Sequence, residues 1–245
     1  RCRRVRRLET LVPVRSFHLV TASLTECVVV LPAYQAGGTL PSLLPDLIRL
    51  VPAPRILVVN DGSDDTTEAV ARTAGVHVVC HERNRGKGAA LRTGFSWWLT
   101  RPEWNGLLTM DADGQHAPAD LVHLVDAWTR SEADIITGRR AIHGSAMPWE
   151  RRLSNMITSA LVSWRTGQRV DDSQCGFRLL TRRVVEEVQI SADGFEAETE
   201  LLIRASARGF RIASAPVQTI YAGERSFMTH WATTKAFVRT LLSEV

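Results

Sequence analysis

Short apolar runs alternate along the chain with longer segments whose apolar residues recur at helical spacing. The first run, residues 27–31, is continuously apolar and is closed by Pro32, which is typical of a strand buried on both faces of a parallel sheet. Residues 39–50 follow with leucines at helical spacing and with Thr39 as a candidate N-cap. The same alternation predicts strands at 56–59, 76–79, 106–110 and 134–138 and helices at 66–73, 86–98 and 118–130.

This regular alternation predicts an α/β fold with a twisted, mostly parallel central sheet flanked by helices. Beyond residue 140 the pattern is less regular. It predicts helices at 149–164, 181–188 and 198–208 and strands at 176–180 and 211–220. Ligands of parallel sheets bind beyond the carboxyl ends of the strands. Polar segments follow four of the predicted strands, and we expect them to converge on one crevice: 32–34, 60–63, 111–113 and 138–139.

Two carboxylates one residue apart follow the apolar strand at 106–110. In an extended backbone, residues i and i+2 point to the same side, so Asp111 and Asp113 can offer oxygen ligands to one divalent cation. Mg²⁺ or Mn²⁺ bound by one or two carboxylates keeps positions for water and substrate phosphates. A strand followed by an Asp-Gly turn also explains the motif, and only its place at the end of a predicted strand favours the metal site.

The length and composition of the chain favour one large domain. We expect a basic extension over residues 1–25 and a single domain over 26–245. Five of the first seven residues are arginine, which suits either contact with anionic lipid or a solvated tail. Beyond this cluster, charges of both signs are interspersed and no basic stripe is interleaved with aromatic residues, so nucleic-acid binding is not expected.

No apolar run approaches the roughly 20 residues that cross a bilayer, and the first residues are too basic for a secretory signal. We therefore expect a soluble, cytoplasmic protein. The four cysteines are far apart and form no Cys-x-x-Cys pattern, which argues against a zinc site and against a disulfide scaffold. They are expected to be free thiols: Cys2, Cys27, Cys80 and Cys175.

Seven motifs in this order resemble glycosyltransferase family 2, whose members are inverting enzymes with the GT-A (Rossmann-like nucleotide-diphospho-sugar transferase) fold. The motifs are Leu31–Tyr34, Val58–Ser63, Asn84–Gly88, Met110–His116, Gly138–Arg139, Asp172–Arg178 and Glu198–Glu200. The resemblance covers about residues 26–240. Within the family, the chain looks most like the polyprenyl-phosphate (dolichyl-phosphate) mannosyl- and glucosyltransferases.

The resemblance implies roles for particular residues. The nucleotide-sugar site would comprise Pro32, Tyr34, Asp61, Ser63, Lys87, Asp111 and Ala112. The Mg²⁺ or Mn²⁺ ligands would be Asp111, Asp113 and Gln115, with Asp113, Arg139 and Glu198 as catalytic residues. The acceptor side would include Arg178, Glu200 and Arg225.

Simpler explanations exist for several of these residues. Asp61 and Asp64 can cap the helix that follows them, and the Gly-Lys-Gly around Lys87 can be a tight loop. This loop is not a P-loop, because neither Gly-x-x-x-x-Gly-Lys-Ser/Thr nor Gly-x-Gly-x-x-Gly is present. His116 is expected to be a turn histidine and Arg140 to be solvated.

The chemistry of the acceptor decides whether the reaction needs a base. A hydroxyl acceptor needs a carboxylate within hydrogen-bond reach, whereas a lipid phosphate is already ionised. Glu198 is the first candidate for a base and Glu200 the second, although carboxylates are also common at helix N-termini. Phe227 stands after Ser226 where polyprenyl-phosphate relatives often have a basic residue. The segment 227–242 suits either an interfacial helix or a helix packed on the core.

We therefore expect a metal-dependent inverting glycosyltransferase that moves a hexose from a GDP-mannose or UDP-glucose type of donor to a polyprenyl phosphate. It would work at the inner face of the cytoplasmic membrane, in cell envelope glycan biosynthesis. The alternatives are a saccharide or other hydroxyl acceptor, a sugar nucleotidyltransferase, and an inactive nucleotide-binding module. Nucleotidyltransferases typically carry a basic glycine-rich loop after the first strand, and Gly37 and Gly38 have no Arg or Lys nearby.

Overall fold

The computed structural model describes residues 24–140, 149–220, 237 and 239–241. Its strands are β1 (Cys27–Ala33), β2 (Ile56–Asn60), β3 (His77–Cys80), β4 (Gly106–Thr109), β5 (Ile135–Arg140), β6 (Arg178–Thr181) and β7 (Ile212–Val217). Its α-helices are α2 (Leu40–Ile48), α3 (Thr67–Thr73), α4 (Lys87–Leu99), α5 (Leu121–Ser131), α6 (Trp149–Thr166), α7 (Arg182–Glu187) and α8 (Ala197–Ala207). Short 3₁₀ turns, η1 (Ala53–Arg55) and η2 (Pro118–Asp120), precede β2 and α5.

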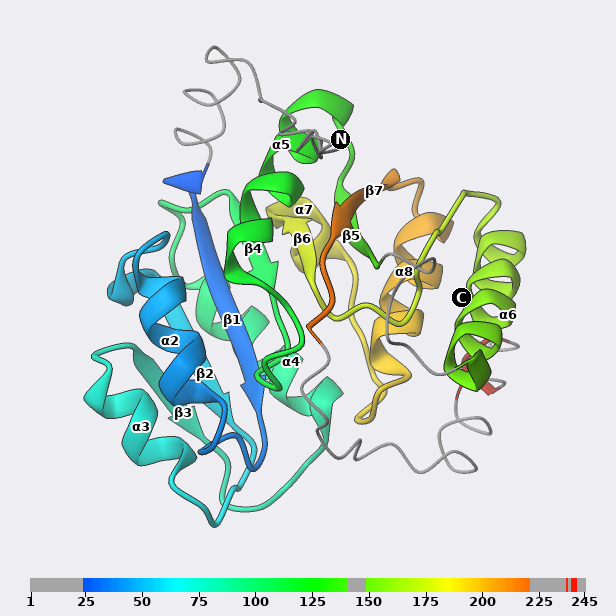
Figure 1. Cartoon of the computed structure of the whole chain (residues 1–245). Helices are drawn as coiled ribbons and strands as arrows, with labels where there is room; N and C mark the ends of the chain where they lie inside the picture. The colour runs from blue at the N-terminus through cyan, green and yellow to red at the C-terminus, as the bar shows by residue number, and fades with distance from the viewer. Residues whose placement is uncertain (1–23, 141–148, 221–236, 238, 242–245) are drawn as a thin grey trace, which may run out of the picture.

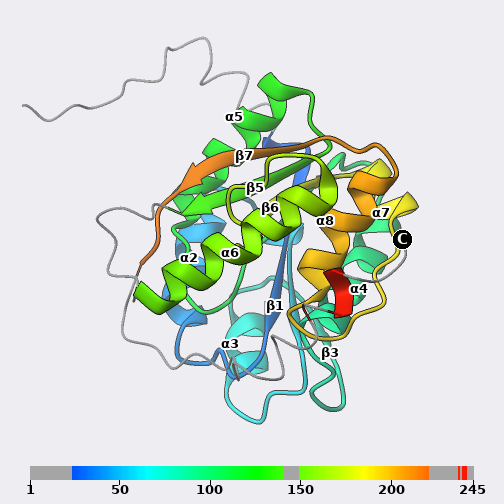
Figure 2. The same ribbon diagram turned by 90° about the vertical axis from the view of Figure 1, so that its right-hand side faces the viewer.

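Within the described residues the strands form one sheet in the order β3-β2-β1-β4-β6-β5-β7. Neighbouring strands run parallel, except that β6 is antiparallel to both β4 and β5. Helices cover both faces of this sheet (Figures 1 and 2). The predicted α/β fold with a mostly parallel sheet is therefore confirmed.

Alternate residues of the central strands face two separate layers of the core. Val29 and Leu31 of β1 belong to a layer that contains the leucines of α2 and α5. Val28 and Val30 belong to the opposite layer, which contains Trp98 of α4 and apolar side chains of α8. A strand buried on both faces must be apolar at every position, and this explains the continuous valine run in β1. Each fully buried side chain of this size contributes about 1.5–3 kcal/mol.

Strands β1, β2 and β4 run in one direction, and β5 runs in that direction too because β6 is antiparallel to both β4 and β5. The carboxyl ends of these four strands therefore lie at one edge of the sheet. The segments that follow them are the ones in which polar candidate residues were predicted. The structure thus brings these segments to one edge, as the alternation of strand and helix predicts.

Several other expectations can be compared with the structure. Cys27, Cys80 and Cys175 are free thiols, as predicted, and Cys2 lies outside the described residues.

The predicted boundary at residue 26 stays a prediction, although Leu24 already packs into the core. Most of the segment 227–242 lies outside the described residues, but Leu241 is buried. No described helix combines the length and the apolar character that a bilayer crossing needs.

Candidate active site

Lys87 lies between two carboxylates that come from distant parts of the chain. Its Nζ atom is 2.6 Å from Asp111 Oδ1, after β4, and 3.1 Å from Glu198 Oε1, in the first turn of α8. The ammonium also lies 5.6 Å from the centre of the Phe195 ring. Sequence motifs predicted for the donor side and for the acceptor side therefore meet at one cation.

The opposite charges of Lys87 and its two carboxylate neighbours stabilise the ionised form of Lys87 and of Asp111. Burial disfavours the charged form of Lys87, but Asp111 and Glu198 outweigh it and raise the pKa of Lys87 well above its usual range. Burial also acts against ionised Asp111, yet the positive charge of Lys87 lowers the pKa of this carboxyl below its usual range. Lys87 is thus a fixed cation and Asp111 a fixed anion at neutral pH.

Close packing at the start of α4 puts Lys87 in place. Gly88 N donates to Asp193 O at 2.7 Å, and a Cβ atom at Gly88 would come within 2.1 Å of Ala192 O. Gly86 has a φ of +94°, a backbone conformation that glycine adopts most easily. The Gly-Lys-Gly motif therefore lets the first turn of α4 approach the loop 191–194, and the tight-loop explanation covers only part of its role.

Glu200, in the first turn of α8, binds the backbone of the loop 191–194. Its carboxylate accepts hydrogen bonds from the backbone N–H groups of Ser191 and Ala192 at 2.9 and 2.8 Å, and it pairs with Arg204 at 2.8 Å. The side chain is buried. Glu198, and not Glu200, is the carboxylate beside Lys87, and the predicted contact of Glu200 with an acceptor stays a prediction.

Asp61 is a buried carboxylate that organises the loop before α4. It accepts hydrogen bonds from Arg85 N at 3.0 Å and Gly86 N at 2.8 Å, and its Oδ1 lies 2.6 Å from His81 Nδ1. The other ring nitrogen of His81 is 2.9 Å from the Thr93 hydroxyl. Asp61 thus fixes the backbone that leads to Lys87, and its predicted contact with a nucleoside remains a prediction.

The helix-capping explanation for Asp61 is wrong. The carboxylate that bonds the start of α3 belongs to Asp65, which accepts from Thr67 N at 2.9 Å. Asp64 instead bonds the side chain of Gln35. Sequence reasoning missed His81, because a single histidine after a strand carries no distinguishing signal.

The other predicted nucleotide-sugar residues line the same edge of the sheet. Tyr34 is 40% exposed just after β1, and Pro32 lies within that strand. The Ser63 hydroxyl accepts from Gln35 N at 2.9 Å, which joins the loops after β1 and β2. The carbonyl of Ala112 accepts from the Thr39 hydroxyl and so joins the loops after β1 and β4.

The Asp-x-Asp motif does not lie in an extended strand, and that premise of the sequence argument is wrong. Strand β4 ends at Thr109, and the motif continues into a turn in which Gly114 has a φ of +74°. One carboxylate oxygen of Asp113 accepts from Gln115 N at 2.9 Å. The Asp-Gly turn is therefore present, while Asp111 faces Lys87. Among the described residues, no group of three His, Cys, Asp or Glu side chains is arranged to hold a metal.

Arg178 is a fully buried guanidinium that binds backbone. It donates to the carbonyls of Cys175 at 2.8 Å, Ser173 at 2.8 Å and Glu198 at 2.7 Å. These bonds attach the loop 173–175 to the start of α8. Arg178 thereby holds the backbone of Glu198 through its carbonyl group. Its predicted role toward an acceptor stays a prediction, and Arg225 lies outside the described residues.

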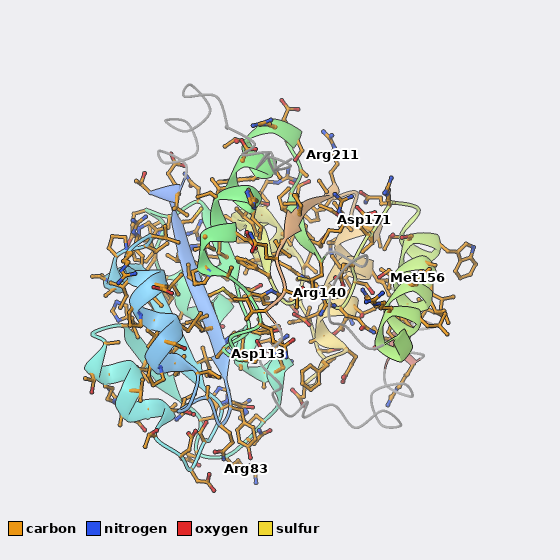
Figure 3. The ribbon with its side chains drawn as sticks, viewed as in Figure 1. Arg83, Asp113, Arg140, Met156, Asp171 and Arg211 are labelled. Carbon is orange, nitrogen blue, oxygen red and sulfur yellow. The ribbon has the colours of Figure 1, made fainter. Side chains whose placement is uncertain are left out.

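The two arginines at the end of β5 lie in different surroundings. Arg140, which we expected to be solvated, is mostly buried and forms two bonds to Asp172, at 2.7 and 3.0 Å. That expectation is wrong, and Arg140 is also among the cations that lower the pKa of Asp111. The Arg139 side chain is 49% exposed and lies 3.8 Å from Asp171. Figure 3 shows Arg140 and Asp113 in the middle of the molecule, between β1 and α6. The catalytic role of Arg139 stays a prediction.

His116 is buried behind the Asp-x-Asp turn, where sequence reasoning expected an ordinary turn histidine. Its ring lies 5.2 Å from that of Phe177, and its Nδ1 atom is buried without a hydrogen-bond partner among the described residues. Burial, which outweighs the attraction of Asp111, lowers the pKa of His116 from 6.5 to about 4. The ring is therefore neutral at pH 7.

Comparison with known proteins agrees with this fold and shows the family to which the chain belongs. Residues 28–188 match the family model described as Glycosyl transferase family 2. Polyprenol monophosphomannose synthase of Mycolicibacterium smegmatis is 33% identical over 201 residues, which cover 77% of this chain and 75% of that protein. Undecaprenyl-phosphate mannosyltransferase of Micrococcus luteus is 30% identical over 199 residues, which cover 77% of this chain and 81% of that protein. The chain belongs to glycosyltransferase family 2 and is a glycosyltransferase.

A solved structure supports the fold independently. Glucosyl-3-phosphoglycerate synthase of Mycobacterium tuberculosis, in complex with Mn²⁺ and UDP-glucose, superimposes with a TM-score of 0.74 at 23% identity. The match covers 91% of this chain and 80% of that one. The predicted GT-A fold is thereby confirmed.

Gly176 gives a test of the space around Asp111. A Cβ atom at this position would lie 2.5 and 2.6 Å from the two carboxylate oxygens of Asp111. Gly176→Ala should push Asp111 away from Lys87 and weaken nucleotide binding by about tenfold or more, while unfolding free energy falls by about 1–3 kcal/mol. Gly38→Ala, where a Cβ atom meets nothing within 4 Å, is the matched control. Unchanged nucleotide affinity in Gly176→Ala would contradict this account.

The buried His116 predicts a loss of stability in mild acid. The unfolded chain takes up a proton near pH 6.5 and the folded chain only near pH 4, so stability is lost as the pH falls through this window. By pH 4.5 the loss from this residue is about 2–3 kcal/mol. His116→Leu should remove that part of the loss when urea unfolding with chelator is compared at pH 7 and pH 4.5. An equal loss in both proteins would show that His116 is not responsible.

Proposed function

We propose that this glycosyltransferase moves a hexose from a GDP-mannose or UDP-glucose type of donor to a polyprenyl phosphate, with inversion at the anomeric carbon. The names of the relatives support this acceptor. They include the two proteins above and a dolichyl-phosphate hexose transferase of Haloferax volcanii, which is 29% identical over 191 residues. Phe227, which stands where polyprenyl-phosphate relatives often have a basic residue, lies outside the described residues.

The observation that carries the proposal is the position of Lys87 between Asp111 and Glu198, at 2.6 and 3.1 Å. A donor diphosphate and an acceptor phosphate are both anions and need a nearby positive charge. A cation fixed before the substrates bind requires no reorganisation when charge develops on the leaving group. Lys87 would therefore stabilise the departing nucleoside diphosphate while it attracts the phosphate of the acceptor.

The contact of Glu198 with Lys87 favours an ionised acceptor. Glu198 Oε1 lies 3.1 Å from Lys87 Nζ and would have to give up this contact to reach the hydroxyl of an acceptor. An oxygen of a lipid phosphate can attack the anomeric carbon without losing a proton. The new bond forms between this oxygen and the anomeric carbon, and the bond from that carbon to the diphosphate breaks, its electron pair leaving with the nucleoside diphosphate.

The residues after β4 supply the kinds of donor atom that a divalent metal prefers. Two carboxylates and one amide, from Asp111, Asp113 and Gln115, form a small set of oxygen donors, the type that Mg²⁺ and Mn²⁺ prefer when substrate phosphates complete the coordination. We infer that these residues would hold the ion. When bound, the ion would neutralise charge on the diphosphate. Mn²⁺ accompanies UDP in a structural neighbour, glucosyl-3-phosphoglycerate synthase.

The alternatives differ in what the site must do. A saccharide or other hydroxyl acceptor would need Glu198 to leave Lys87 and accept a proton. An inactive binding module would bind nucleotide without turnover. Family membership disfavours a sugar nucleotidyltransferase. Because polyprenyl phosphates are anchored in a bilayer, we place the reaction at the cytoplasmic face of the membrane, in cell envelope glycan biosynthesis.

Calorimetric titration tests the donor site. GDP and UDP are each titrated into the protein with Mn²⁺ and, separately, with chelator. One nucleotide should bind in the presence of Mn²⁺, and Asp113→Ala should weaken this binding by about 10- to 100-fold, as expected for a lost ligand. The nucleotide that binds assigns the donor to the mannose or the glucose type.

Thr73→Ala, an exposed change on α3, is the control and should bind as the wild type does. Equal affinity with and without Mn²⁺ would contradict the metal site. Binding of neither nucleotide under any condition would contradict the proposed donor.

A further inference from the structure

Helix α6 packs against the protein through a mostly polar face. Among residues 152–166, whose burial is described, the buried ones are Asn155, Ser159 and Val162, of which only the last is apolar. The hydroxyl of Ser159 accepts a hydrogen bond from Ser173 N at 3.0 Å, and that of Ser163 accepts from Val170 N at 2.9 Å. A surface helix of a globular protein normally turns its apolar stripe inward. In α6 the polar side is the one that faces the protein.

The apolar side of α6 faces outward. Eight large hydrophobic side chains are exposed in the described part of the chain, and five of them lie on this helix. The exposed fractions are 49% for Leu153, 54% for Met156, 51% for Ile157, 36% for Leu161 and 76% for Trp164. Their spacing puts them on one face of the helix. In Figure 2, α6 crosses the front of the molecule, and Figure 3 labels Met156 on this helix. We call these five residues the α6 stripe.

Positive charge predominates on α6. The helix contains three arginines, Arg151, Arg152 and Arg165, and one acidic residue, Glu150. Arg169, beyond the end of the helix, is paired with Asp171 at 2.7 Å. A second copy of this chain would bring the same excess of positive charge to the contact. An anionic lipid surface complements both the apolar stripe and its positive ends, and tryptophan favours the membrane interface.

The α6 stripe is also connected to the candidate active site. On the inner side of α6, Ser159 bonds Ser173, and Thr158 Oγ1 lies 3.1 Å from Gln174 Nε2. The same loop supplies Asp172, which binds Arg140, and the carbonyl of Ser173, which binds Arg178. A membrane against the outer face of α6 would thus lie one helix away from the acceptor side.

We propose that the α6 stripe inserts into the headgroup region of a membrane containing anionic lipid, with the helix lying along the surface. The proposal rests on the proposed function in so far as the acceptor is a membrane lipid. The helix would then present the phosphate of a polyprenyl chain to the site while its hydrocarbon tail stays in the bilayer. The inverted amphipathic character of α6 is explained by this contact.

Flotation with vesicles tests the surface. The full chain is mixed with vesicles of phosphatidylglycerol and phosphatidylcholine in equal parts, and the bound fraction is measured. Ile157→Glu combined with Trp164→Glu should lower the partition coefficient by about tenfold or more, because two anchors of the stripe become charged. Trp164→Phe, which keeps an aromatic anchor, should bind within about twofold of the wild type.

The matched control adds the same charge elsewhere. Ala69→Glu with Thr73→Glu introduces two carboxylates at exposed positions of α3, away from α6, and keeps every arginine of the chain. This variant should float as the wild type does. If both double variants lose binding equally, net charge and not the α6 stripe is responsible, and the proposal is overturned.

Two further results would also overturn the proposal. One is a wild-type protein that does not bind these vesicles. The other is a wild-type dimer that the α6 variant converts to a monomer without any vesicle binding, since the stripe would then join two copies. Nucleotide titration of the same variants separates this proposal from the proposed function. If vesicle binding behaves as expected but neither GDP nor UDP binds, the membrane surface stands and the donor assignment falls.

Discussion

The ammonium of Lys87, held between Asp111 and Glu198, is the interaction on which the rest of the site depends. Two buried or partly buried carboxylates would repel each other without this cation. Its distances of 2.6 and 3.1 Å tie the loop after β4 to the start of α8, which are 87 residues apart in sequence from Asp111 to Glu198. Removing one member leaves an uncompensated charge in a poorly solvated place, which is the costly case for buried ion pairs.

Much of the remaining polar chemistry keeps this cluster in position. Asp61 fixes the backbone before Lys87, Glu200 fixes the loop against which α4 begins, and Arg178 binds the carbonyl of Glu198 at 2.7 Å. Each of these charged groups is buried and satisfied by backbone atoms. Hydrogen bonds of this kind to charged groups contribute about 1.5–3 kcal/mol each and hold the site rigid before substrates bind.

The order of strands and helices could be predicted from periodicity, because strands buried on both faces are apolar throughout and amphipathic helices separate them. The residues that meet at the site could also be named from their motifs. The groups that each of these side chains contacts could not be predicted from the sequence. Spacing does not tell whether Arg139 or Arg140 turns inward where β5 ends. It also does not decide whether Asp111 and Asp113 lie in an extended strand or in a turn. Nor does a sequence motif distinguish Arg178, whose donors all reach carbonyl groups, from an arginine that binds substrate.

A double-mutant cycle on Lys87 and Glu198 tests the central claim most directly. Lys87→Met, Glu198→Gln and the double variant are compared by kcat/KM for transfer to a polyprenyl phosphate. If the two side chains act as one unit, the double variant should be within about threefold of the worse single variant, because the second change removes an interaction that is already lost. Losses that multiply across the two substitutions would contradict the account, since Lys87 and Glu198 would then act independently.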